Sequence, residues 1–438
     1  MRSPYALLVS LSALCTFPAV TFAQMDYYIA SSFGSQFNDV NDSGVAVSGG
    51  AYFDFATEVW TLMEAEATEM VSINNNGDVA GSMYLDVDLF ILQPAYKKNG
   101  VWNPIGWFSG SNPQESSFTT YSISPNGVWV TGQMSMGCCD FGTFKYNTET
   151  GVLTEIFDAA YVAVAGYVIT NDGTIGGWAD DEPAGGTRRI PVYITPDLDI
   201  IQVSPDLPQF NTNAVNDINA SSLMVGDFDN QPFVYDLGTN TFTRFDVPVG
   251  YETATFTSVS DNGVAVGYAQ RFGEFGSLLR EAIVYHPDLG VEPLFLKDIL
   301  LSNGVDIQAP TGRMGTAYAI SPNGEYVVGW DDQPPFSANG WVVYFDELLF
   351  SSTTSIPTDA NQDLSISAFP NPAQDLLTIT AATHIDLVTI FNTHGQLVAQ
   401  HTLQSNTGVV DISELSSGVY TVRATNRDAS YVTSVVKQ

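Results

Sequence analysis

The sequence contains few cysteines and histidines, and this shortage limits the kinds of site that the chain can build. It has three cysteines and four histidines in 438 residues. Cys15 lies near the N-terminus, and Cys138 and Cys139 are adjacent, so no disulfide framework joins distant segments. In an oxidising compartment we expect a vicinal disulfide between Cys138 and Cys139, with a soft-metal site as the alternative.

Three of the four histidines, His384, His394 and His401, fall in the last fifth of the chain, which leaves only His286 in the rest. A histidine-based metal site or a Ser-His-Asp site in the main part of the chain is therefore excluded. The sequence also contains no CxxC pair and no glycine-rich phosphate loop that opens a helix.

Basic residues are scarce as well. The chain has 14 Lys and Arg against 48 Asp and Glu, for a net charge of −34, although only 14% of its residues are charged. Such a surface repels nucleic acid and anionic membranes, so neither is expected as a partner. Cations, neutral glycans and basic proteins remain open as partners. No cofactor is required by any motif, and Ca²⁺ is a candidate ligand of acidic loops.

Only the N-terminus carries a long apolar run, from Ala6 to Val20, after Arg2 and before the small-x-small segment Thr21-Phe22-Ala23. We interpret residues 1–23 as a secretory signal peptide read by the Sec translocon, because the apolar core is short and contains Pro18. No other run reaches the length of a membrane-spanning helix, so we expect no transmembrane segment in the mature chain.

A ten-residue motif, typified by ISPNGEYVVG from Ile320, recurs along residues 24–350 at intervals of roughly 47 residues. An Asn-Gly or Asp-Gly pair marks the turn in most copies and supplies the positive φ angles of a two-residue hairpin. A second hairpin with aromatic strands follows each motif. The seven copies begin at Val40, Ile73, Ile123, Ile169, Ile218, Val259 and Ile320.

Two hairpins per repeat make four strands, and seven such units predict an all-β chain that forms a seven-unit β-propeller. Phe55 to Met70 has an amphipathic helical pattern, but it occupies the hairpin position between two motifs, so the repeat predicts strands there. We also predict that Tyr27 to Ala30 pairs with Trp341 to Phe345 and closes the ring, so that removal of Met25 to Phe33 destabilises it.

The repeat ends before a polar linker at residues 351–363, and residues 364–438 have a separate strand pattern that predicts a small immunoglobulin-like β-sandwich. The tail contains Phe369-Pro370-Asn371-Pro372, glycine-centred segments around Gly395 and around Gly418 and Tyr420, and Lys437 near its end. In these motifs it resembles the C-terminal sorting domain of the type IX secretion system of Bacteroidetes. The resemblance implies passage through the periplasm, contact with the type IX secretion machinery, and release or attachment at the outer cell surface.

The repeats themselves resemble extracellular repeats of the HAF type and the turns of Tol-B-like propellers. Neither resemblance implies a fixed activity, because propellers support binding, hydrolysis and scaffolding alike.

Equivalent strand ends of a propeller face the same rim, and acidic and aromatic residues follow the second strand of several motifs. A ring of carboxylates beside aromatic faces suits Ca²⁺ or a sugar, whereas polar loops of an acidic protein are the simpler explanation. The candidate ligand-binding residues at this rim are Trp178, Asp180, Asp181, Asp227, Asp229, Tyr268, Trp330, Asp331 and Asp332.

The sequence thus predicts a secreted or surface-displayed protein that binds a glycan or a surface protein. A polysaccharide hydrolase that uses two rim carboxylates is the first alternative, and a structural surface protein is the second. The arginines form no set of the sialidase type, which favours binding over catalysis, and no catalytic residue is identified.

Overall fold

The computed structural model describes residues 25–30, 36–86, 88, 90–112, 116–135, 141–181, 188–208, 213–273, 277–302, 305, 307, 314–333, 337–345, 366–391, 397–413, 415–425 and 430–438. The chain separates into two compact units, Met1–Ser351 and Ser352–Gln438. The signal peptide, the linker, Cys138, Cys139 and Gly395 lie outside the described residues.

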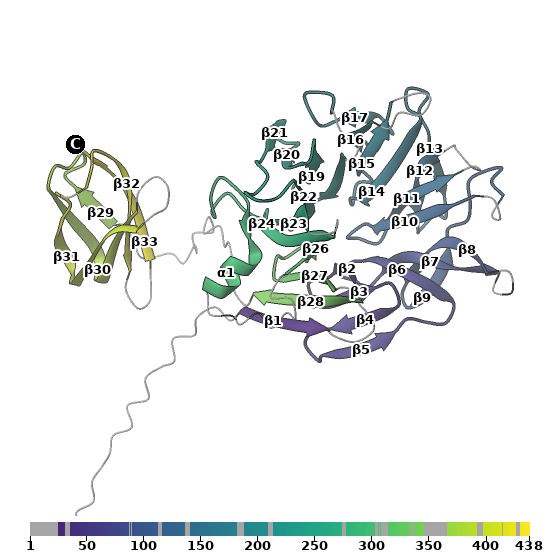
Figure 1. Ribbon diagram of the computed structural model, residues 1–438, viewed down its shortest axis with the longest axis horizontal. Coiled ribbons are helices and arrows are strands. Elements are labelled where there is room, and N and C mark those ends of the chain that lie inside the picture. The colour runs from purple at the N-terminus through teal and green to yellow at the C-terminus, as the bar shows by residue number, and fades with distance from the viewer. Residues whose placement is uncertain are drawn as a thin grey trace, which may run out of the picture. The chain divides into compact units, whose positions relative to one another are not determined.

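The described strands of the first unit form seven antiparallel blades that follow one another around a ring in chain order (Figure 1). The last residue of each innermost strand is the first residue of a repeat motif, and the turn and second strand of the motif follow it, which confirms the predicted β-propeller. Blades 1 to 3 consist of β2 (Phe37–Val40), β3 (Val45–Ser48), β4 (Ala51–Asp54) and β5 (Val59–Leu62), then β6 (Ala67–Ile73), β7 (Val79–Asp86), β8 (Ile91–Lys98) and β9 (Val101–Pro104), then β10 (Phe118–Ile123), β11 (Trp129–Ser135), β12 (Phe141–Asn147) and β13 (Leu153–Ile156).

Blades 4 to 6 repeat this pattern, and blades 3 and 4 are also joined by one parallel pairing, Phe141 with Ala163. Their strands are β14 (Ala163–Ile169), β15 (Ile175–Asp180), β16 (Arg189–Ile194) and β17 (Ile200–Gln202), then β18 (Ala214–Ile218), β19 (Leu223–Phe228), β20 (Gln231–Asp236) and β21 (Thr241–Arg244), then β22 (Thr253–Val259), β23 (Ala265–Phe272), β24 (Leu278–Tyr285) and β25 (Leu294–Phe295).

Blade 7 takes its outer strand from the other end of the chain. Strands β26 (Thr316–Ile320), β27 (Tyr326–Gln333) and β28 (Ser337–Phe345) are joined by β1 (Met25–Ala30), which pairs with β28 from Gly340 to Phe345. In Figure 1 the purple strand β1 accordingly lies beside the green strand β28. The predicted closure of the ring is confirmed. The fourth strand of this blade is therefore β1, and not the second half of a hairpin that begins at Trp341.

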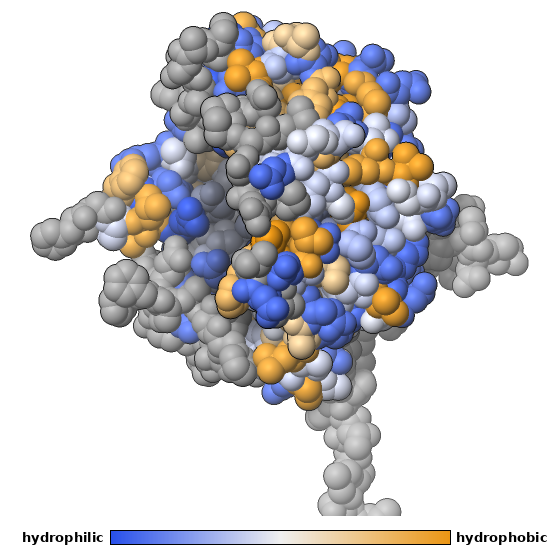
Figure 2. All heavy atoms as spheres, turned by 90° about the vertical axis from the view of Figure 1, so that its right-hand side faces the viewer, coloured by the Kyte–Doolittle hydropathy of each residue, from blue (hydrophilic) through white to orange (hydrophobic). Residues whose placement is uncertain are grey.

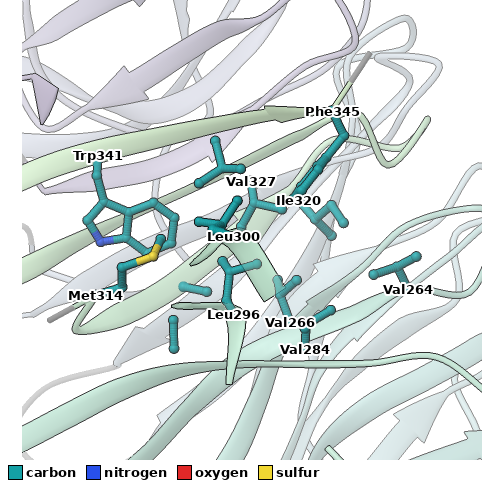
Figure 3. Packing of buried hydrophobic residues seen from close by; sticks show 13 residues of the cluster. Val264, Val266, Val284, Leu296, Leu300, Met314, Ile320, Val327, Trp341 and Phe345 are labelled. Atoms are coloured by element: carbon teal, nitrogen blue, oxygen red, sulfur yellow. The ribbon is translucent and has the colours of Figure 1, made fainter. Parts of the chain in front are cut away.

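The amphipathic pattern of Phe55 to Met70 forms no helix, because β5 and β6 occupy this segment. The described part of the chain contains one helix, α1 (Leu296–Ser302), which the repeat did not predict. Leu296 and Leu300 of α1 are fully buried against blades 6 and 7, beside Met314 and Trp341 (Figure 3). Burial of each leucine stabilises this junction by about 2 kcal/mol.

The turns of neighbouring blades are also joined by side-chain amides and carboxylates. Asn41 donates to the carbonyl of Asn74 in the next blade at 3.2 Å, and Asn219 donates to Ser260 at 2.9 Å. The ring closes in the same way, since the backbone N–H of Asn323 in blade 7 donates to Asp42 in blade 1 at 2.8 Å. The polar residues of the repeated turns therefore hold the blades together.

The second unit has its own buried core and one set of paired strands. The immunoglobulin-like topology expected for it stays a prediction. Its described strands are β29 (Ile366–Phe369), β30 (Leu376–Phe391), β31 (Leu397–Asp411), β32 (Gly418–Thr425) and β33 (Ser430–Lys437). Among the described residues of the whole chain, no helix is long and apolar enough to cross a membrane.

Candidate ligand-binding site

A cavity of about 660 Å³ lies between the innermost strands of the propeller, within the size range of small-ligand sites. All seven blades contribute to its lining through strands β2, β6, β10, β14, β18, β22 and β26 or the strands beside them. The cavity is thus a site to which every repeat contributes. The face of the molecule in Figure 2 shows no comparable concentration of one kind of residue, because hydrophobic residues are scattered there among hydrophilic ones.

Each innermost strand has a register shift at the same place, at the residue that stands two positions before the last residue of the strand. Each shift leaves one residue without a direct partner on the second strand. Such a bulge bends the strand and redirects a side chain, and here all seven bulge residues line the cavity. They are Asn38, Val71, Tyr121, Tyr167, Asn216, Thr257 and Tyr318.

The glycine that ends most copies of the motif accommodates this bulge. A β carbon on Gly226 would lie 1.9 Å from the carbonyl oxygen of Ala214, and one on Gly177 would lie 1.9 Å from that of Ala165. Equivalent clashes arise in every blade except blade 1, where Ser48 takes the position. The repeated glycine thus permits the bulge that directs a side chain into the cavity.

Aromatic rings form one part of the cavity wall. The rings of Tyr121 and Tyr167 lie 4.7 Å apart, and the ring of Tyr318 lies 4.9 Å from that of Trp330. Tyr318 keeps 40% of its surface accessible because it faces the cavity and not a neighbouring blade. Burial raises the pKa of Tyr121 to about 12, so its phenol stays neutral and can donate a hydrogen bond.

Asp39 and Asp217 occupy the position after the bulge in blades 1 and 5, and each bridges to the next blade. Asp39 accepts backbone N–H bonds from Val40 and Ile73, and Asp217 accepts equivalent bonds from Ile218 and Val259. Burial raises both pKa values, that of Asp39 to about 7, in spite of these bonds. The two carboxyls also lie where the first cavity meets a second one of about 480 Å³ on the turn side of the ring.

Asp227 accepts no backbone hydrogen bond from the described residues, unlike Asp39 and Asp217. It accepts from the hydroxyl of Thr255 at 3.2 Å and from the amide of Asn216 at 3.5 Å. Burial raises the pKa of Asp227 to about 7, and the nearby Arg189 guanidinium opposes this rise. Arg189 itself lies 4.2 Å from the centre of the Trp178 ring, which orients it by a cation–π contact.

The structure brings only part of the predicted rim into this cavity. Asp227 and Tyr268 line it, and Trp178 and Trp330 pack behind Arg189 and Tyr318. The remaining predicted residues do not line the cavity. Asp180 and Asp331 are buried, Asp181 forms an ion pair with Arg188 at 2.6 Å, Asp229 adopts a left-handed backbone with φ of 51°, and the side chain of Asp332 lies outside the description.

Reasoning from the sequence missed the tyrosines and carboxylates of the innermost strands. The tyrosines stand two residues before the motif, and Asp39 and Asp217 stand one residue before it, where strand alternation predicts no special orientation. The signal available in the sequence is the short distance, 10 or 11 residues, from the bulge position to the glycine that closes the motif. Among the described residues, no group of three or more His, Cys, Asp or Glu side chains is arranged to hold a metal ion.

The sorting motif of the second unit is assembled around the last strand. Exposed Phe369 and Pro370 lead to Asn371, whose side chain accepts from the N–H of Val436 at 2.9 Å. Gly418 pairs with Lys437 in β32 and β33, and the Lys437 ammonium is mostly buried, 3.8 Å from Asp375. Pro372 is exposed beside this group, and the hydroxyl of Tyr420 donates to Ser416 at 2.7 Å.

Comparisons with known proteins give one family match and several similar folds. Residues 367–438 match the family described as the secretion system C-terminal sorting domain. PorZ, a surface component of the type IX secretion system of Porphyromonas gingivalis, is similar at 13% identity and a TM-score of 0.44, over 94% of this chain and 58% of PorZ. This chain therefore aligns with little more than half of PorZ.

Two other solved structures have comparable similarity. The β-propeller domain of the Trilobed protease from Pyrococcus furiosus is 11% identical, with a TM-score of 0.45 over 78% of this chain and 100% of that domain. TolB from Acinetobacter baumannii is 11% identical, with a TM-score of 0.40 over 71% of this chain and 78% of TolB. The comparison with curated protein sequences found no match.

The sorting domain determines where the protein goes and what handles it on the way. A chain with this domain is exported to the cell surface or beyond it and interacts with the type IX secretion machinery. The part of the chain that this domain exports is the first unit, whose strand pairing is that of a β-propeller. The chain is a β-propeller protein with a type IX secretion C-terminal sorting domain, and it acts at or outside the cell surface.

Proposed function

We propose that the exported propeller is a binding module that holds a glycan in its central cavity. One observation carries this proposal: seven bulges at equivalent positions direct side chains from seven blades into one cavity. A structural surface protein has no need of bulges that expose tyrosine rings to an internal cavity.

The lining has the chemistry that sugar recognition uses. Tyrosine rings offer flat apolar faces for stacking on a sugar ring. Hydroxyl and amide side chains around them, such as Thr119, Asn216 and Gln270, can exchange hydrogen bonds with sugar hydroxyls. A signal peptide that directs the chain to the Sec translocon fits the same pathway and is part of the proposal.

The test is calorimetric titration of the full chain with a panel of neutral and charged oligosaccharides, with an assay for released reducing ends on the same mixtures. We expect binding without release of sugar. Tyr318→Ala should weaken binding at least about 10-fold, because an aromatic contact inside a site contributes on the order of 1–2 kcal/mol. Phe90→Ala, at a side chain that is 75% exposed outside the cavity, is the matched control.

Two results would contradict the proposal. Release of reducing ends would favour the hydrolase alternative, in which two cavity carboxyls act as acid and base. Absence of binding across the whole panel would favour a protein ligand or a structural role at the cell surface.

A further inference from the structure

We propose that the central cavity selects an amino sugar, whose ammonium group lies among the cavity carboxylates while its ring stacks on the tyrosines. This inference rests on the proposed glycan-binding function and narrows its ligand class. It follows from the charge of the lining, from the positions of the cations in the blades, and from the combination of rings with hydrogen-bonding groups.

The lining is strongly unbalanced in charge. Its acidic residues are Asp39, Glu69, Asp217 and Asp227, and Arg189 is its one basic residue among those described. Glu69 has no hydrogen-bond or ion-pair partner among the described residues, and its carboxylate is therefore available to a ligand. Asp39 and Asp217 are already bonded to backbone N–H groups, so the cavity offers the carboxyls of Glu69 and Asp227 to a ligand and little that would attract a sulfated or carboxylated sugar.

Three lysines of the surrounding blades do not compensate this charge, because each is bonded elsewhere. Lys97 pairs with Glu64 and donates to the hydroxyl of Tyr52 at 3.1 Å. Lys98 donates to the carbonyl of Gly127 at 2.9 Å, and Lys145 donates to Pro196 at 3.0 Å. None of the three lines the cavity. A cationic ligand would thus meet carboxylates without a competing lysine.

The tyrosines strengthen the preference for an ammonium group. The face of an aromatic ring attracts a cation within about 6 Å of its centre. Among the described residues, four rings in the second strands of the blades already make this contact, and one of them is the cavity residue Tyr268, whose ring centre lies 4.6 Å from the Arg280 guanidinium. Tyr121, Tyr167 and Tyr318 have no such partner among the described residues, which leaves their faces for a ligand.

The size and polarity of the cavity favour a sugar over a single lysine side chain. A cavity of about 660 Å³ is far larger than a butylammonium group needs. Its wall also carries hydroxyls and amides from blades 1, 3, 5 and 6, and although several of them, such as Asn216, are bonded within the blades, the hydroxyl of Thr120 has no partner among the described residues. Such groups can bond to sugar hydroxyls and gain nothing from an alkyl chain. The ligand therefore carries both an amine and hydroxyls.

The experiment compares two sugars that differ only in whether the amine is free or acetylated, with a peptide as a third ligand. The full chain is titrated at pH 7.0, where the sugar amines and the Asp227 carboxyl are both partly charged, with the β-1,4-linked tetrasaccharide of glucosamine, with its fully N-acetylated counterpart, and with tetralysine. We expect the free-amine tetrasaccharide to bind at least about 10-fold more tightly than either of the others, because the interaction with one buried charge amounts to 1–2 kcal/mol.

The other outcomes separate this inference from the function on which it rests. Equal or tighter binding of the acetylated sugar would overturn selection for an amine and leave glycan binding intact. Tetralysine binding as tight as that of the amino sugar would overturn the sugar and point to a lysine-bearing protein. If neither these sugars nor the wider panel binds, the proposed function fails as well.

Variants test whether the cavity makes the distinction. Glu69→Gln and Asp227→Asn should each reduce the preference for the free amine several-fold, while binding of the acetylated sugar changes little. Glu69→Gln breaks no described hydrogen bond, so its fold is expected to be intact, and a thermal melt verifies this. Asp199→Asn, on an exposed turn, is the control. An unchanged preference in both cavity variants, or a preference that Asp199→Asn reduces equally, would overturn the assignment.

Discussion

Gly226 faces the carbonyl oxygen of Ala214 so closely that a β carbon at Gly226 would lie 1.9 Å from it. This contact sits beside the bulge at Asn216, where the innermost strand of blade 5 turns a side chain into the cavity. Six blades share the arrangement. The glycine that recurs in the sequence motif thus permits the bulge that directs a side chain into the cavity.

Gly226→Ala should destabilise the propeller. A methyl group cannot occupy space so close to a backbone oxygen, so the bulge must move at a cost of about 2–4 kcal/mol in the free energy of unfolding. Gly49→Ala is the matched control, because a β carbon there meets no atom within 4 Å and the backbone does not have positive φ. Denaturant unfolding measures both variants. Equal stability of the two would contradict this role of the glycine.

Removal of Met25–Ala30 should destabilise the whole ring. Strand β1 pairs with β28 over six residues and supplies the outer strand of blade 7, so its loss exposes an unpaired strand edge and separates the two ends of the ring. We expect a melting temperature lower by several degrees and easier proteolysis near Trp341. Truncation at Gln24 keeps β1 and is the control. A melting temperature that does not change would show that the ring holds without this strand.

Asp227 should make the stability depend on pH. Burial raises its pKa from 3.8 to about 7, so between these values the folded chain binds more protons than the unfolded chain. Stability therefore falls as pH rises from about 4 to about 7. Asp227→Asn should reduce this fall and melt higher than the parent at pH 8. Asp199→Asn removes a surface charge and controls for the net charge of −34. The assignment would be contradicted if the melting temperature changed with pH in the same way in Asp227→Asn and in Asp199→Asn.

Deletion of residues 367–438 should stop export at the periplasm, because the matched sorting domain is then missing. The propeller has its own core and strand pairing, so we expect the truncated chain to fold there. Cell fractionation and immunoblotting locate it, and the full chain is the control. Truncated protein at the cell surface or in the medium would show that another part of the chain directs its export.

A large part of the architecture could be predicted from the sequence, because the turns depend on neighbouring residues and the hairpin motif is repeated. Asn-Gly turns require particular backbone angles, and seven copies of one hairpin motif indicate the seven blades. The pairing of Tyr27 to Ala30 with Trp341 to Phe345 also followed, since a ring of blades needs a closing strand. Helix α1 did not follow, because its formation depends on packing against blades 6 and 7.

The sequence by itself thus determined the repeat, the turns and the sorting domain, in which neighbouring residues carry the signal. The tertiary structure alone decided where the site is. Which side chain a bulge turns inward depends on the register between two strands, and register is a relationship between separate segments. Closure of the ring then brings Asp39, Tyr121, Tyr167, Asp227 and Tyr318 from five blades to one cavity, although they are spread over 280 positions of the chain.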